Sequence, residues 1–143
     1  MTSDRPTLGD VAAKARLLPE AWDLVDGEQA RLVATRCEHC SRLTFPPVAV
    51  CPQCWDRLDL RRELLPARGV LYAWTVVHVP GSGIAAPYAI GCVDFPDVSV
   101  RIVSRLVDWT GISVGDPVEF VAGVLRERAE GPLLGWMVRK AQV

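Results

Sequence analysis

One stretch decides the first half of this fold: CEHCSRLTFPPVAVCPQC, residues 37–54. It holds two Cys-x-x-Cys pairs, Cys37 with Cys40 and Cys51 with Cys54, and ten residues separate the pairs. Two intervening residues let a tight turn aim both thiolates of a pair at the same ion. A second such turn across a short hairpin completes a tetrahedron of sulfur ligands. The stretch therefore predicts a structural metal site with no open position for substrate.

The four thiolates also narrow the choice of metal. Soft sulfur ligands select zinc or iron over magnesium or calcium, and this spacing is typical of structural zinc sites. We predict a rubredoxin-like zinc ribbon over residues 31–57, with iron as the alternative occupant. His39 lies inside the first turn beside better ligands, so we expect it to be exposed.

Composition favours metal-bound cysteines over disulfides. The chain has 143 residues, half of them hydrophobic, and its 16 basic side chains nearly balance 17 acidic ones. A net charge of −1 argues against a basic nucleic-acid binder, whose affinity comes mainly from phosphate neutralisation. No apolar run is long enough to cross a bilayer, and charged residues interrupt the N-terminal stretch 1–19. We therefore expect a cytoplasmic protein in a reducing compartment.

Residues 1–30 favour helical structure. The segment 10–18 is rich in good helix formers and stops before Pro19. A second helix is predicted over 20–25, with its end near Gly27. The short run 31–36 then leads, as a strand, into the first cysteine pair.

Beyond residue 58 the hydrophobic period changes to two. Strands are predicted where β-branched and aromatic residues gather, over 69–79, 88–95, 98–107, 117–125 and 133–139. Too few residues separate them for the helical crossovers of a parallel sheet. Glycines such as Gly69 and Gly91 indicate bulges or sharp bends in these strands. Residues 58–143 are thus predicted to form a five-stranded OB-fold barrel, which makes the chain mainly β with N-terminal helices.

The order of these elements resembles a known family. A strand ends in Cys37, the two cysteine pairs flank Phe45-Pro46-Pro47, the strand 72–78 follows, and Pro87-Tyr88 opens the next. This series is similar to the acyl-CoA-associated zinc-ribbon and OB-fold proteins, catalogued as domain of unknown function thirty-five. The resemblance covers residues 21–124, most of the chain.

That resemblance implies an accessory subunit. Family members pair with thiolases, with thiolase-like aldolases of steroid side-chain degradation, or with hydratases that act on acyl-CoA. They stabilise the partner and help the CoA thioester reach the partner's active site. On this resemblance we expect a non-catalytic subunit that binds zinc, a thiolase-fold acyl-CoA enzyme and a CoA thioester.

Arginine usage supplies candidate contacts with CoA. Nearly all basic side chains are arginines, and Arg57, Arg61 and Arg62 follow the second cysteine pair. Guanidinium groups bind phosphates bidentately, and CoA carries a pyrophosphate and a 3′-phosphate. Together with His78, which precedes a glycine-rich loop, these arginines are the expected CoA contacts. The alternative is a solvated strand face on which the arginines pair with acidic neighbours.

Three aromatic residues are expected to contact a partner protein: Trp22, Trp55 and Phe45. Trp22 lies on the second predicted helix and Trp55 directly follows a metal ligand, and large aromatic side chains often anchor interfaces. For the two tryptophans the alternative is a core that fills the seam between helix, ribbon and barrel. Cys92 lies in the middle of a strand, where a buried cysteine behaves as a small hydrophobe, and we assign it to the core.

Two other functions stay open on the sequence alone. Nucleic-acid-binding modules use OB barrels, although this acidic chain lacks a basic stripe with exposed aromatics. An independent acyl-CoA hydrolase or dehydratase needs an acid or base held by a partner group. The chain has two histidines, and the sequence identifies no carboxylate that orients His78. Intrinsic catalysis is therefore not expected.

Overall fold

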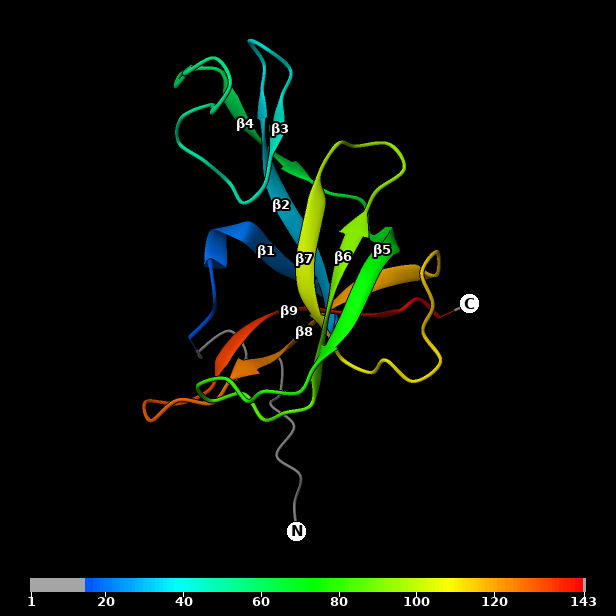
Figure 1. Ribbon diagram of the computed structural model, residues 1–143. Coiled ribbons are helices and arrows are strands. Elements are labelled where there is room, and N and C mark those ends of the chain that lie inside the picture. Colours follow the sequence, from blue (N-terminus) through cyan, green and yellow to red (C-terminus); the bar gives the residue numbers. More distant parts are fainter. Residues whose placement is uncertain (1–14, 143) are drawn as a thin grey trace.

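The computed structural model describes residues 15–142 of the chain. Nearly all regular structure in this part is strand (Figure 1). One short 3-10 turn, η1 (Pro19–Ala21), precedes the first strand. The strands are β1 (Trp22–Asp26), β2 (Gln29–Cys37), β3 (Leu43–Thr44), β4 (Leu60–Leu64), β5 (Arg68–Val77), β6 (Tyr88–Asp94), β7 (Arg101–Leu106), β8 (Pro117–Arg126) and β9 (Leu133–Lys140).

Five of these strands close into a barrel. Hydrogen bonding runs in the order β8–β5–β6–β7–β9, and the pairing of β8 with β9 closes the ring. Neighbours are antiparallel except β7 and β9, which meet in parallel at Leu106 and Val138. A five-stranded barrel of this kind is an OB-fold. The predicted barrel is confirmed, and its strands match β5 to β9 with small shifts at their ends.

Strand β2 joins the ribbon to the barrel. Its first half pairs with β1 and reaches β8 through Gln29 and Val121. Its second half pairs with β3 and β4 and ends at Cys37. Near the same junction Arg139 donates to Glu119 at 2.8 Å and to Glu28 at 2.6 Å. One continuous strand therefore fixes the ribbon against the barrel (Figure 1).

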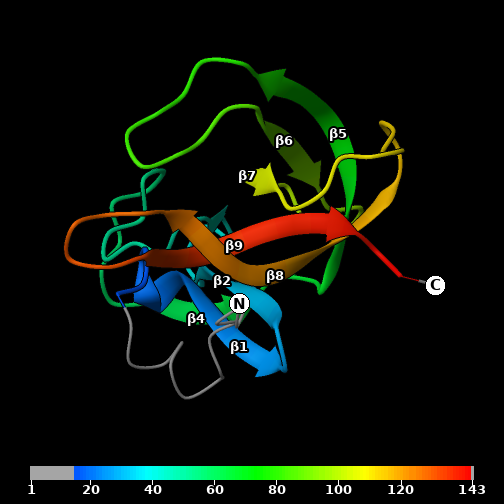
Figure 2. The same ribbon diagram turned by 90° about the horizontal axis from the view of Figure 1, so that it is seen from below.

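The N-terminal hairpin contributes to the barrel's core. Seen from below, β1 and β2 lie on the opposite side of β8 and β9 from β5, β6 and β7 (Figure 2). Trp22 and Leu32 of this hairpin are fully buried in one cluster with Leu71, Phe120 and Val138. Burial of each such side chain contributes about 1.5–3 kcal/mol. The hairpin is therefore part of the folded unit and not an appendage.

The helix predicted over 20–25 is wrong. Residues 22–26 form β1, which pairs antiparallel with 29–32 around a two-residue turn at Gly27-Glu28. Gly27 has a φ of 56°, which the first residue of a tight hairpin turn requires, and this hairpin buries Trp22. Most of the helix predicted over 10–18 lies outside the described residues. Its described end is not helical, because Arg16 forms a parallel bridge with Leu134 of β9.

Between residues 15 and 142, no helix has the length and apolar character that a membrane span requires.

Candidate metal centre and binding residues

The two cysteine pairs form turns of the same design. In the first, the N–H of Ser41 donates to the carbonyl of Cys37 at 2.8 Å. In the second, the N–H of Trp55 donates to the carbonyl of Cys51 at 2.9 Å. Ser41 and Trp55, which follow the last cysteine of each turn, share a φ of 67°. In each turn, a backbone hydrogen bond thus holds the segment that carries the two sulfurs.

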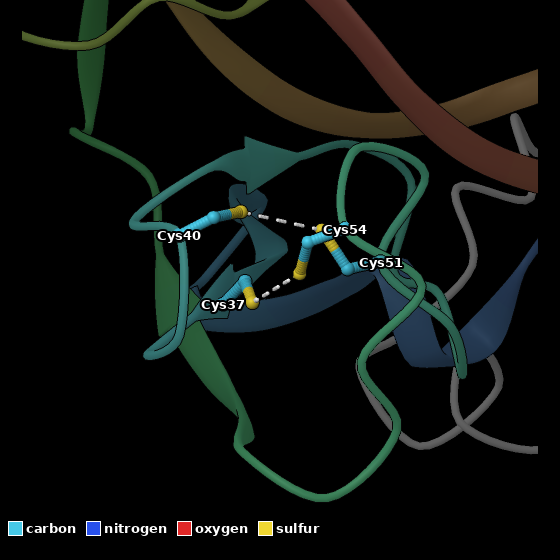
Figure 3. Close-up of side chains that lie close together, drawn as sticks. All are labelled: Cys37, Cys40, Cys51 and Cys54. Carbon is cyan, nitrogen blue, oxygen red and sulfur yellow. Dashed lines mark hydrogen bonds between the residues drawn. The ribbon is translucent and has the colours of Figure 1, made fainter.

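The four sulfurs face one another (Figure 3). The Sγ atoms of Cys37 and Cys54 lie 3.6 Å apart, as do those of Cys40 and Cys51, and all four lie within 4.8 Å of one another. A zinc ion with Zn–S bonds of about 2.3 Å needs tetrahedral edges of about 3.8 Å. None of the four is in a disulfide. The donor set therefore fits a tetrahedral thiolate-bound ion.

The electrostatics of the cluster also favour a cation. The backbone N–H of Cys54 stabilises the Cys51 thiolate and lowers the pKa of Cys51 to about 6. The N–H of Asp56 lowers the pKa of Cys54, but desolvation and the hydrogen bond with Cys37 outweigh it and raise that pKa to about 12. Without an ion, the Cys51 thiol therefore ionises more readily than the Cys54 thiol. A divalent ion would supply the charge that four thiolates need.

The predicted CoA contacts do not converge on one site. Arg61 pairs with Glu38 and Glu63, whereas Arg62 pairs with Asp23. Since side chains alternate along a strand, these neighbours in β4 point to opposite faces. Arg57 and His78 are exposed. His78 follows β5 directly, at the end of the barrel away from the ribbon (Figure 1).

The predicted partner contacts differ sharply in exposure. Trp22 is fully buried, and its indole N–H donates to the carbonyl of Leu17 at 2.8 Å, so this side chain is a core residue and not a partner anchor. Phe45 is half-buried and packs edge-to-face on Trp136 with ring centroids 5.5 Å apart. Trp55 is 75% exposed on the ribbon. Of these three residues, Trp55 is the one that presents its ring to solvent.

The barrel surface carries two arginine–tyrosine pairs that were not predicted from the sequence. The guanidinium of Arg101 lies 3.7 Å from the ring centroid of Tyr72, and that of Arg105 lies 5.3 Å from the centroid of Tyr88. The alternating pattern of β7 could have predicted that both arginines lie on the outer face of the barrel. Their tyrosine partners come from β5 and β6, and only the register of the sheet reveals them.

Family models match both halves of the chain. The ChsH2 rubredoxin-like zinc ribbon domain matches residues 26–61, and the ChsH2 C-terminal OB-fold domain matches residues 63–123. A solved structure named Ltp2-ChsH2(DUF35) aldolase is 30% identical and covers 78% of this chain and 86% of its own, with a TM-score of 0.57. The chain belongs to the DUF35 family. The predicted zinc ribbon is thereby confirmed, with Cys37, Cys40, Cys51 and Cys54 positioned to bind its metal ion.

Two curated relatives carry the description DUF35 domain-containing scaffold protein. A DUF35 domain-containing scaffold protein of Methanothermobacter thermautotrophicus is 26% identical over 76% of this chain and 84% of its own length. A protein of the same description from Methanocaldococcus jannaschii is 29% identical over 78% of this chain and 81% of its own length. This DUF35 chain therefore spans most of each relative.

Proposed function

We propose that this chain is a non-catalytic accessory subunit of a thiolase-fold acyl-CoA enzyme. One observation carries the proposal: the chain covers 86% of the matched chain in the structure named Ltp2-ChsH2(DUF35) aldolase, at 30% identity. The description of the two curated relatives as scaffold proteins points the same way. The substrate of the partner would be an acyl-CoA thioester, with steroid side-chain thioesters among the candidates.

In this proposal the zinc ribbon is a rigid support. Four sulfur ligands leave no open position on the ion, so it would hold the two turns in place and would not polarise a substrate. The second turn presents Trp55, whose exposed ring would anchor the partner enzyme. Carbon–carbon bond cleavage or formation would take place on residues of the partner.

The CoA thioester would contact this chain at the ribbon rather than at His78. Arg61 and Arg62 are held by carboxylates in the described structure, so a phosphate would have to displace those pairs. Arg57 is exposed beside the second turn. We therefore assign the first phosphate contact to Arg57. Since Arg61 and Arg62 point to opposite faces of β4, only one of them would be a further contact in the assembled complex.

Co-expression with a thiolase-fold acyl-CoA aldolase tests the function. The two chains should elute together on size-exclusion chromatography, and the aldolase should lose thioester turnover or stability when it is made alone. Separate elution, with no effect of this chain on the aldolase, would refute the proposal. Titration with a labelled single-stranded oligonucleotide tests the nucleic-acid alternative, which needs binding at physiological salt.

A further inference from the structure

The outer face of β5, β6 and β7 carries an apolar groove that the zinc ribbon does not touch. Side chains alternate across a strand, so β6 buries Ala89 and Val93 while Ile90 and Cys92 face outward. The groove has a volume of ≈ 200 Å³. Its outward side chains are Ala73, Thr75, Ile90, Cys92 and Val103. Cys92 is thus half-buried in a surface groove, which corrects its assignment to the core.

The groove is exposed along β7. Val103 of this strand is 62% exposed and pairs with Cys92 of β6. Toward one end, Tyr72 is 53% exposed beneath the guanidinium of Arg101. Exposed apolar side chains bordered by tyrosine and arginine match the composition of protein interfaces more closely than that of ordinary surface.

The two ends of the groove differ in charge. Arg101 is neutralised by Asp94, to which its Nε and Nη2 donate at 2.7 and 2.9 Å. Arg105 stacks near Tyr88 and donates to the carbonyl of Leu125 at 2.5 Å. Within residues 15–142, Arg105 has no carboxylate partner, and its buried Nε has no hydrogen-bond acceptor. At this end of the apolar groove, no carboxylate of the described residues compensates the positive charge.

We propose that this face is a docking surface for the partner enzyme. Its occupant would be a protein segment that lays apolar side chains over Val103 and places a carboxylate on Arg105. This inference rests on the proposed function and adds the surface of contact. A protein segment fits better than a nucleic acid, because bases need open aromatic faces for stacking. Here Arg101 and Arg105 lie over the two tyrosine rings.

The test uses two valines of equal exposure. Val103 is 62% exposed in the groove, and Val114 is 63% exposed on the loop between β7 and β8. In the co-expressed complex, Val103→Glu should weaken association with the aldolase by about tenfold or more, as for a residue at the centre of an interface. Val114→Glu should leave association unchanged. Equal affinities of the two variants would overturn the docking surface.

Cys92 gives a second measurement on the unchanged protein. Alkylation of its thiol by N-ethylmaleimide, followed by mass spectrometry of the Cys92 peptide, should slow severalfold when the aldolase binds. An unchanged rate in a complex that does form would overturn the docking surface and leave the accessory function standing. Failure of the wild-type chains to associate would overturn both. Oligonucleotide binding that Val103→Glu abolishes would assign the groove to nucleic acid and refute the proposal.

Discussion

Trp55 combines two unfavourable features at one residue. Its ring is 75% exposed, and its backbone has a φ of 67°, a region that costs non-glycine residues about 1–2 kcal/mol. Glycine adopts this conformation freely. Because the ring is mostly exposed, it adds little burial to the stability of the isolated chain. The backbone conformation belongs to the turn, since Ser41 shares it in the first turn, whereas the exposed ring makes sense if it anchors a partner.

Substitution of Trp55 separates the two effects. Trp55→Gly should be more stable than Trp55→Ala by about 1 kcal/mol, because only glycine relieves the left-handed backbone. Urea denaturation of the zinc-bound chains measures this difference. Both variants should bind the aldolase less tightly than the wild-type chain does. Equal stability of the two variants would show that the turn stores no backbone strain.

Asp94 makes the stability of the barrel depend on pH. The hydrogen bond from Arg101 lowers the pKa of the Asp94 carboxyl below its ordinary value. A carboxyl whose pKa is lower when folded stabilises the protein above its unfolded pKa of about 4, and that stabilisation is lost as the pH falls through the folded value. Asp94→Asn should therefore destabilise the chain at pH 7, and the destabilisation should shrink as the pH falls below about 4. A destabilisation that does not change with pH would mean that the carboxylate charge is not involved.

At the scale of the elements, the strands were predictable and the first hairpin was not. The five barrel strands follow from alternation and β-branched residues, which report directly on a half-buried sheet. The segment 20–25 has good helix formers, but its hairpin depends on the burial of Trp22 against residues of the distant barrel. Helix propensities differ by less than about 1 kcal/mol per residue. Burial of one tryptophan therefore outweighs them.

Gly69 shows how closely two barrel strands approach. A Cβ atom on this residue of β5 would lie 2.4 Å from Cγ1 of Val93 and 2.8 Å from the carbonyl oxygen of Asp94. Since a backbone atom cannot move aside cheaply, Gly69→Ala should destabilise the chain by about 1–3 kcal/mol. Gly81→Ala is the control, because its nearest neighbour would be at 3.6 Å. Thermal unfolding compares them, and equal midpoints would contradict this account of the packing.

At the scale of the whole molecule, the metal site was more predictable than the binding surfaces. Four cysteines with fixed spacing indicate one ion, whatever the rest of the chain does. No fixed spacing in the sequence constrained the positions of the arginine and aromatic side chains that were predicted to bind CoA or a partner. Their roles depend on which face each side chain takes and on which carboxylate lies opposite, as Arg61 and Arg62 show. Those relations arise only from the register of the sheet.

Metal removal should loosen the ribbon and leave most of the barrel folded. After chelation of the ion, amide hydrogens of β3, β4 and the end of β2 near Cys37 should lose protection from exchange. The barrel strands β5 and β6 should keep most of theirs, because they do not pair with β2. Hydrogen exchange with mass spectrometry resolves the two regions. Uniform loss across the chain would show that ribbon and barrel unfold as one cooperative unit.

The central claim is that a sulfur-bound zinc ion organises this chain as a scaffold. Elemental analysis of the chain, purified without added metal, tests it most directly. We expect one zinc ion per chain, and Cys51→Ser should lose most of it. A wild-type preparation that contains no zinc, or that contains iron in its place, would contradict the account.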